Sequence, residues 1–171
     1  MASYDMGKDR IVEWIRTQYR EGASCLDVGA CDGKWADLLG GYLKMDACEI
    51  WEPNAKKLRG KYERIFIQNI TDLHYDHYDL VIFGDVLEHM PVRDAQRVLA
   101  YADAHSTDYI VGLPFNYYQG AIYGNPYERH LQPDLTPEIV AARYPQLKEL
   151  LRAAHDYAYY HRRLEDDGEQ V

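Results

Sequence analysis

The sequence contains little cysteine and has no long apolar run. Of its 171 residues only three are cysteines, at positions 25, 31 and 48. They lack the C-x-x-C spacing of a metal site and cannot all pair, which favours a reducing compartment. The N-terminal segment lacks the apolar core of a signal peptide, and no segment has the length of a membrane span. We therefore expect a cytoplasmic protein that does not enter a membrane.

Positive charge is also scarce. The chain has 19 Lys and Arg residues against 28 Asp and Glu residues, and a formal net charge of −9. Nucleic acids and anionic membranes are bound mainly through clusters of Lys and Arg. The charge balance therefore disfavours both as partners. The sequence carries no signal for a particular oligomeric state.

Tyrosine, in contrast, is abundant, with 16 copies against three phenylalanines. A phenol combines an apolar ring with a hydroxyl group, which suits a pocket that must be apolar and still orient its ligand. Several tyrosines gather between residues 117 and 127. For any single tyrosine, packing beneath a loop is the commoner role.

Apolar runs and helical patterns alternate along the first two thirds of the chain. Strands are expected over residues 24–29, 45–51, 64–68, 78–84 and 108–113, and helices over 8–20, 33–42, 53–62 and 91–105. No clear helix is expected over 69–78. Connections of this length favour parallel strands with right-handed crossovers. The pattern predicts a doubly wound α/β fold, with a mostly parallel, Rossmann-like sheet and helices on both faces.

The pattern changes after residue 113. Residues 114–135 hold three prolines and two glycines without a clear period, which predicts a long ordered loop. A helix begins at Thr136, because Pro137 suits its first position. Residues 146–163 fit either a helix or two antiparallel strands, and we favour the strands. We expect one domain over 1–163, with a leading helix in 1–22 and an acidic tail over 164–171.

A glycine-containing turn, "DVGACDG", follows the first predicted strand. A dinucleotide-binding G-x-G-x-x-G turn needs glycine at positions 31 and 34, which are Cys31 and Lys34. A P-loop needs a hydroxyl at position 35, which is tryptophan. Asp27 and Asp32 would also repel a phosphate. The turn therefore disfavours a nicotinamide-dependent oxidoreductase and suits a ligand with a cationic end.

An acid follows the turn at the end of the second predicted strand. Glu49 lies sixteen residues after Gly33, close to where a ribose-binding carboxylate belongs in such folds. Glu52 is the competing acid, but Pro53 directly after it favours Glu49. A carboxylate can accept hydrogen bonds from both ribose hydroxyls. A nucleoside without phosphate is therefore the candidate ligand.

These features, together with "YDLVIFGDVLEHM", resemble the class I S-adenosylmethionine-dependent methyltransferases, especially small-molecule enzymes of the ubiquinone-biosynthesis kind. The resemblance covers roughly residues 22–140, and Cys31 replaces the middle glycine of the family's motif. It implies direct displacement of a methyl group from S-adenosylmethionine to a small-molecule acceptor, with S-adenosylhomocysteine as product.

The resemblance also implies roles for particular residues. Asp27 would order the turn and reach the amino group of the cofactor, Glu49 would hold the ribose, and Ile50 would pack on the adenine. Asn69 and the Ile70 amide would read the edge of the adenine. The full expected cofactor set is Asp27, Gly29, Ala30, Cys31, Gly33, Glu49, Ile50, Asn69, Ile70, Asp85 and Val86.

Two histidines are candidates for a base that removes a proton from the acceptor. His89 follows the fourth predicted strand and His130 precedes the Thr136 helix; the alternative is that both only bond to nearby backbone. Asp85 and Glu88 with these histidines could form a metal site, but the spacing does not compel one, and no metal is expected. The expected acceptor wall comprises Phe115, Asn116, Tyr117, Tyr118, Tyr123 and Tyr127.

Other functions are disfavoured or left open. After the fourth predicted strand the chain reads Gly84-Asp85-Val86-Leu87, whereas nucleic-acid methylating enzymes would show Asn/Asp-Pro-Pro-aromatic or Pro-Cys there. Because the chain is short and has no recognisable lid, a catalytically idle module that binds S-adenosylmethionine as a sensor or partner subunit remains the alternative to an enzyme.

Overall fold

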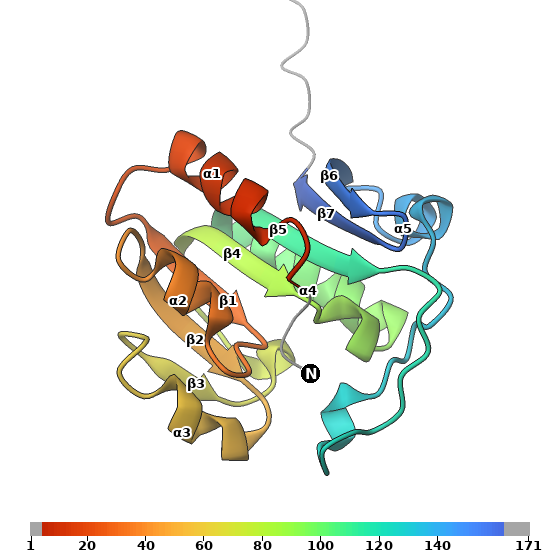
Figure 1. Cartoon of the computed structure of the whole chain (residues 1–171), viewed down its shortest axis with the longest axis horizontal. Helices are drawn as coiled ribbons and strands as arrows, with labels where there is room; N and C mark the ends of the chain where they lie inside the picture. The colour runs from red at the N-terminus through yellow and green to blue at the C-terminus, as the bar shows by residue number, and fades with distance from the viewer. Residues whose placement is uncertain (1–4, 163–171) are drawn as a thin grey trace, which may run out of the picture.

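The computed structural model describes residues 5–162, which form a seven-stranded sheet flanked by helices (Figure 1). The strand order is β3-β2-β1-β4-β5-β7-β6. The strands are β1 Ser24–Val28, β2 Lys44–Glu49, β3 Ile65–Ile67, β4 Tyr78–Gly84, β5 Ser106–Pro114, β6 Leu147–Ala154 and β7 Tyr157–Arg162. The predicted acidic tail, 164–171, lies outside the described residues.

The five neighbouring strands β3, β2, β1, β4 and β5 are all parallel, and β7 is antiparallel to both of its neighbours, β5 and β6. This confirms the predicted mostly parallel sheet and its antiparallel C-terminal pair. The interpretation of residues 146–163 as two strands is also confirmed. Tyr157 and Tyr159 of β7 pack in one apolar cluster and Tyr160 packs in the other, and such β-favouring side chains are stable on covered sheet faces.

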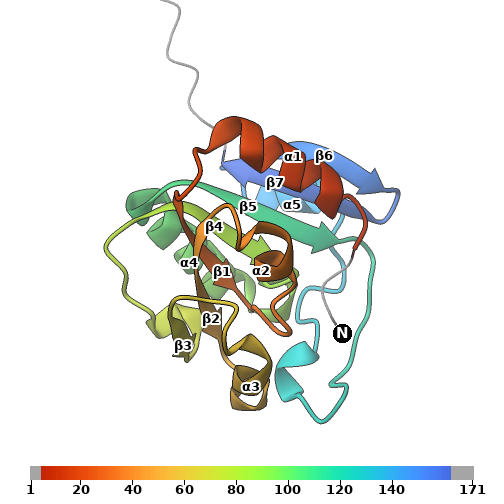
Figure 2. The ribbon, with the colours of Figure 1, turned by 60° about the vertical axis from the view of Figure 1, so that its left-hand side comes forward.

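Helices cover both faces of the sheet, as Figures 1 and 2 show. One face carries α1 Lys8–Gln18, α2 Lys34–Leu39 and α3 Ala55–Leu58, and the other carries α4 Val92–His105 and α5 Pro137–Arg143. Four single turns of 3-10 helix connect them: η1 Glu52–Asn54, η2 Ile70–Asp72, η3 Leu87–His89 and η4 Pro126–Glu128. Within residues 5–162, no helix has the length and apolar character needed to cross a membrane.

The centre of the sheet is buried on both faces. Leu80, Val81, Ile82 and Phe83 of β4 are fully buried. Their side chains point alternately to two apolar clusters, one beneath α4 and the other beneath α1 and α2. A strand covered on both faces is expected to be apolar throughout. The central position of β4 therefore explains its continuous apolar run.

The predicted helices were too long in two places. The helix expected over 33–42 ends at Leu39, and the one expected over 53–62 divides into η1 and the four-residue α3. Arg59 leaves the helical conformation and Gly60 follows with φ of 79°. Between β3 and β4 only η2 is present, in agreement with the absence of a predicted helix there.

The strand order reverses between β1 and β4. In open α/β sheets, ligands bind beyond the carboxyl ends of the strands at such a point. Here β1 ends at the glycine turn, β2 ends at Glu49, and β4 ends at Gly84. Residues 114–135 pass across the same edge (Figures 1 and 2), and η4 and α3 border a common second cavity, lined by Lys57, Asn125 and Glu128 among others. The fold thus gathers segments distant in sequence around one crevice.

Candidate active site

The crevice contains a cavity of about 570 Å³. One side is formed by the ends of β1 and β2 with η2, and the other by η3 and residues 114–135. Predicted site residues that line it are Gly29, Cys31, Glu49, Ile50, Asn69, Ile70, Asp85, Val86, His89, Phe115, Tyr117, Tyr127 and His130. The structure therefore brings together most of the residues singled out from the sequence.

The glycine turn closes one end of the cavity. Gly29 has φ of 69°, and a Cβ atom there would lie 2.7 Å from Cγ2 of Val86. Glycine is thus required both by its conformation and by the close approach of Val86. Cys31 also adopts a left-handed conformation, with φ of 52°. The residue that replaces the middle glycine of the family's motif therefore keeps a glycine-like backbone.

Glu49 ties the turn to the end of β2. Its side chain is buried, Oε2 accepts a hydrogen bond from the Cys31 amide (2.8 Å), and Oε1 accepts one from the Trp51 amide (2.7 Å). A carboxylate has about four acceptor sites, so both oxygens can still accept from a ligand. Glu49 faces the cavity, whereas the competing acid Glu52 is exposed and does not line it.

Asp27 lies behind the turn rather than in the cavity wall, as do Ala30 and Gly33. The Asp27 carboxylate is buried and accepts a hydrogen bond from Tyr62 (2.5 Å). Its Oδ1 atom has no hydrogen-bond partner among the described residues. Burial raises the pKa of Asp27 to about 7, although Tyr62 and Lys8 act in the opposite direction.

The far end of the cavity is formed by Ile50 and the η2 turn. Asn69 caps this turn, because its Oδ1 atom accepts a hydrogen bond from the Thr71 amide (3.0 Å). The side-chain oxygen of Asn69, which could contact the adenine, is therefore already engaged by the backbone of η2. Ile70 is buried beside it and supplies apolar surface to the cavity.

Asp85 and Val86 follow β4 at the middle of the cavity. Asp85 has φ of 56°, another left-handed conformation for a residue with a side chain. Such conformations cost free energy and gather at functional sites. Two more, at Asn116 and Tyr123, lie in residues 114–135. Of these left-handed residues, Cys31 and Asp85 line the cavity itself.

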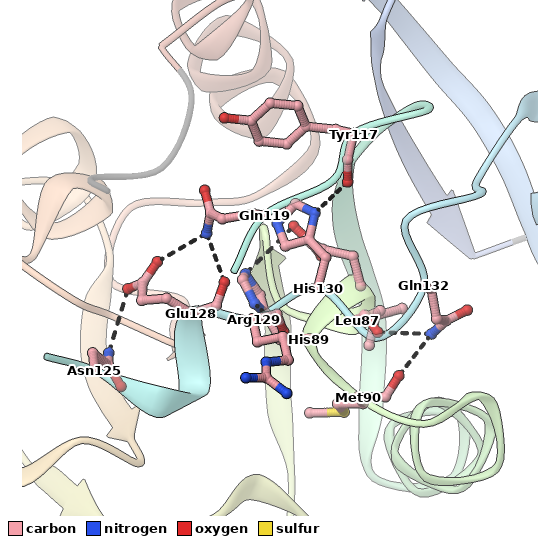
Figure 3. Close-up of polar contacts among 11 residues, drawn as sticks. Leu87, His89, Met90, Tyr117, Gln119, Asn125, Glu128, Arg129, His130 and Gln132 are labelled. Carbon is pink, nitrogen blue, oxygen red and sulfur yellow. Dashed lines mark hydrogen bonds and ion pairs between the residues drawn. The ribbon is translucent and has the colours of Figure 1, made fainter. Parts of the chain in front are cut away.

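Backbone and side-chain hydrogen bonds hold residues 114–135 against η3 (Figure 3). The amides of Leu131 and Gln132 donate to the carbonyl of Glu88, at 2.8 and 3.0 Å. The buried side-chain amide of Gln132 donates to the carbonyls of Leu87 (2.8 Å) and Met90 (3.1 Å). This irregular segment is therefore an ordered wall.

The aromatic residues of that segment take different positions. Phe115, Tyr117 and Tyr127 line the cavity, while Asn116, Tyr118 and Tyr123 do not. Tyr118 is 79% exposed, and Tyr123, 77% exposed, borders a second cavity near η1. The predicted acceptor wall is thus narrower than the sequence indicated, because successive residues of an extended loop point in different directions.

The two candidate histidines, His89 and His130, are in contact in the wall of the cavity. Their rings meet edge to face with centroids 4.7 Å apart. Nδ1 of His89 donates to the Arg129 carbonyl (3.2 Å) and Nδ1 of His130 donates to the Tyr117 carbonyl (2.8 Å) (Figure 3). Since a carbonyl can only accept, each Nδ1 carries the proton and each neutral ring keeps a lone pair on Nε2. Burial lowers the pKa of His89 to about 4 and also lowers that of His130.

The cavity also has polar lining residues outside the predicted site, and four of them lie in η3 and residues 114–135. They are Glu88, Gln119, Asn125 and Glu128. Gln119 and Asn125 are buried and bond to Glu128 and its neighbours, which fixes the η4 turn. No period in the sequence marks these loop residues. Glu88 could have been predicted from the sequence, because it is an acid that stands between the apolar Leu87 and a candidate catalytic histidine.

The chain is similar in structure to several solved methyltransferases. An S-adenosylmethionine-dependent methyltransferase from Clostridium acetobutylicum ATCC 824 has a TM-score of 0.70 at 13% identity, over 92% of this chain and 91% of that chain. The 1,6-didemethyltoxoflavin-N1-methyltransferase of Burkholderia thailandensis, with bound 1,6-didemethyltoxoflavin and S-adenosylhomocysteine, has a TM-score of 0.66 at 18% identity, over 95% and 80%. The magnesium protoporphyrin IX methyltransferase of Synechocystis PCC 6803, with bound S-adenosylmethionine, has a TM-score of 0.63 at 15% identity, over 90% and 76%.

No family model matches the chain, and no curated protein sequence matches it significantly. At identities this low, likeness concerns the path of the backbone and not the chemistry of individual side chains. The narrower resemblance to enzymes of the ubiquinone-biosynthesis kind stays a prediction. The chain has the fold of the class I S-adenosylmethionine-dependent methyltransferases.

Proposed function

We propose that this protein transfers a methyl group from S-adenosylmethionine to a small-molecule acceptor. The observation that carries the proposal is the placement of Glu49 and the glycine turn on one side of a cavity, opposite His89 and His130, in a fold of this class. S-adenosylmethionine would supply an activated methyl group. The protein then has to bind both molecules, align them and exclude water.

The cofactor side follows from the contacts of Glu49 and the turn. Glu49 would accept hydrogen bonds from the ribose hydroxyls while its oxygens remain fixed by two backbone amides. Ile50 would pack against the adenine, with the η2 turn at its edge. Asp27 would order the turn from behind, and Glu49 and Asp85 give the cavity wall negative character near the position expected for the amino group. A phosphate at the same place would be repelled.

The acceptor side would be formed by residues 114–135. Phe115, Tyr117 and Tyr127 offer ring surface, which suits a flat or apolar acceptor. The Nε2 lone pairs of His89 and His130 could take a proton from it. A base is most effective when its pKa lies near the working pH, and the lowered pKa of His89 makes that ring a weak one.

Calorimetry with S-adenosylhomocysteine tests the cofactor assignment. We expect micromolar binding by the wild-type chain, weakened at least about tenfold in Glu49→Gln, because glutamine can accept from only one of the two backbone amides and its NH2 group would face the other. Glu52→Gln is the matched control, since this exposed acid lies outside the cavity, and should change the affinity less than about twofold. Binding of NADH or ATP in place of S-adenosylhomocysteine would refute the proposal.

A second comparison separates a ribose contact from a general disturbance of the turn. Wild-type protein should prefer adenosine to 2′,3′-dideoxyadenosine, because only the former has hydroxyls for Glu49. Glu49→Gln should lose this preference. An unchanged preference in the variant would assign the ribose to another residue.

Turnover distinguishes an enzyme from an idle binding module. The protein is incubated with S-adenosylmethionine and a library of aromatic and hydroxylated small molecules, and S-adenosylhomocysteine is measured by mass spectrometry. Accumulation that depends on an acceptor supports the enzyme. Tight cofactor binding without turnover across the library would favour the sensor or partner-subunit alternative.

A further inference from the structure

Three side chains with metal-binding atoms meet at one point of the cavity wall. Glu88 and His89 belong to η3, and His130 comes from residues 114–135. One ligand atom from each lies within 4.8 Å of the others. All three residues line the cavity, on the side away from Glu49. The cluster therefore faces the space left for an acceptor.

The two imidazoles are oriented as metal ligands usually are. A histidine that binds a metal commonly donates its other ring proton to a backbone carbonyl or carboxylate, which fixes the ring and its tautomer. Here the carbonyls of Arg129 and Tyr117 take the Nδ1 protons of His89 and His130. Both Nε2 atoms are thereby left as acceptors, before any ligand is bound.

The carboxylate of Glu88 is buried without a hydrogen bond. Its side chain is 1% exposed, and within residues 5–162 neither oxygen has a hydrogen-bond partner. The distance from Oε1 of Glu88 to Nε2 of His89 is 3.8 Å, which is too long for a hydrogen bond. A simple Glu–His hydrogen bond therefore does not account for the pair. Such a buried carboxyl either keeps its proton or, when ionised, needs a partner or a metal ion.

The backbone builds this cluster in advance. The carbonyl of Glu88 accepts from the amides of Leu131 and Gln132, which directly follow His130. The residue that offers the carboxylate thus also fixes the segment that offers the second imidazole. Ordered ligands lose little conformational entropy when a metal binds.

We propose that Glu88, His89 and His130 bind one divalent transition-metal cation that holds a hydroxyl oxygen of the acceptor. Two imidazoles and one carboxylate suit first-row divalent cations, and three protein ligands leave positions open for substrate. This departs from the expectation of no metal, because sequence spacing could not place His130 beside η3. The inference rests on the proposed function and names its substrate class as hydroxyl compounds.

The cation would take over the role first considered for a histidine base. Bound to the metal, the acceptor hydroxyl becomes more acidic and releases its proton to water. The oxygen then forms a bond to the methyl carbon while the bond from that carbon to sulfur breaks. The products are a methyl ether or ester, S-adenosylhomocysteine and one proton.

Titration with Co²⁺ alone tests the site without any need for turnover. Calorimetry of the tag-free chain should give one Co²⁺ per chain, and the visible spectrum should show d–d bands that change on ligation by histidine. Glu88→Gln and His130→Gln should each weaken Co²⁺ binding at least about tenfold. His105→Gln is the matched control: its Nδ1 also bonds to a backbone carbonyl, that of Tyr101, but it lies outside the cluster, and its effect should be below about twofold.

Thermal melting and S-adenosylhomocysteine affinity in metal-free buffer check that each variant is folded. Should Glu88→Gln melt early, the two single histidine variants carry the test. No Co²⁺ binding, or binding unchanged in His89→Gln and His130→Gln, would overturn the metal site.

The failures of the two proposals are distinguishable. If S-adenosylhomocysteine binds and Co²⁺ does not, the metal site is wrong and the methyltransferase proposal stands. If Co²⁺ binds at these residues and S-adenosylhomocysteine does not, the proposed function is wrong. If turnover survives a chelator but is lost in His130→Gln, the histidine acts as a base and the role given to the cation is overturned.

Discussion

The two sides of the cavity are built in different ways. The cofactor side consists of strand ends and the turn that joins β1 to α2, so the hydrogen-bonded sheet fixes its geometry. The acceptor side consists of residues 114–135, where η4 is the only helical turn. Its order depends on a few hydrogen bonds to η3, chiefly those of Glu88 and Gln132.

The cofactor side therefore depends mainly on backbone conformation, and the acceptor side depends mainly on contacts of single side chains. On the cofactor side, substitutions that alter backbone conformation should have the greatest effect. On the acceptor side, loss of one buried polar side chain should loosen the wall and leave cofactor binding intact. Such a division would allow the acceptor to differ among proteins that bind the cofactor alike.

The largest effect is expected from Gly29→Ala on the cofactor side. The new Cβ would approach Cγ2 of Val86 to 2.7 Å, at a φ of 69° that alanine disfavours. We expect a loss of about 3 kcal/mol in the free energy of unfolding and no measurable S-adenosylhomocysteine binding. Urea denaturation and calorimetry measure the two quantities.

The double variant Gly29→Ala/Val86→Ala controls for the contact, because it removes Cγ2 but keeps the unfavourable φ. It should recover part of the stability. If Gly29→Ala alone is as stable as the wild type, the turn tolerates a side chain. The cofactor side would then not depend on backbone conformation as proposed.

The pH dependence of stability should report the burial of Asp27. Its pKa rises from an ordinary 3.8 to about 7 in the folded chain, so the folded state holds this proton more tightly than the unfolded state. The stabilising contribution is complete below about pH 3.8 and is lost as pH rises through about 7. Burial is the main cause; Tyr62 and Lys8 favour the ionised form. The neighbouring acids Glu49 and Asp32 act in the same direction as burial and also raise the pKa of Asp27.

Asp27→Asn removes this titration and retains an acceptor for Tyr62. Relative to the wild type, the variant should gain about 4 kcal/mol of stability between pH 4 and pH 8. Urea denaturation at several pH values, without ligand, measures the difference. Parallel stability curves for the two proteins across this range would contradict the assignment.

On the acceptor side, Gln132→Leu tests the dependence on a single side chain. The substitution leaves the carbonyls of Leu87 and Met90 and the hydroxyl of Tyr144 without their buried partner. We expect a loss of about 2 kcal/mol of stability, with S-adenosylhomocysteine affinity changed less than about twofold. Gln96→Leu is the control, since its single bond, to the Arg143 carbonyl, is exposed. A large loss of cofactor affinity would show that the two sides are coupled.

The smallest effect is expected from Cys31→Gly. Cys31 is held at φ of 52°, which costs a residue with a side chain free energy that glycine avoids. Glycine loses more chain entropy on folding, so the net gain should stay below about 1 kcal/mol. Cys48→Ala, a buried cysteine in β2, should instead destabilise the chain. Destabilisation by Cys31→Gly would indicate that the thiol makes a contact worth more than the strain.

The sequence alone indicated the sheet and its cofactor side. Continuous apolar runs such as that of β4 identify strands buried on both faces, and the distance from Gly33 to Glu49 reflects one strand–helix–strand unit. These are local patterns, set by neighbours along the chain. Short α3 was overestimated because helix propensity does not show where tertiary packing ends a helix.

The tertiary structure decided the acceptor side. Only folding shows that Gln132 reaches Leu87, that Tyr118 and Tyr123 point away from the cavity, and that His130 meets Glu88 and His89. These contacts join residues about forty positions apart, and an irregular loop has no period from which side-chain directions can be read. Sequence patterns record the regular hydrogen bonding of strands and helices, whereas a site made by a loop depends on contacts that exist only in the folded chain.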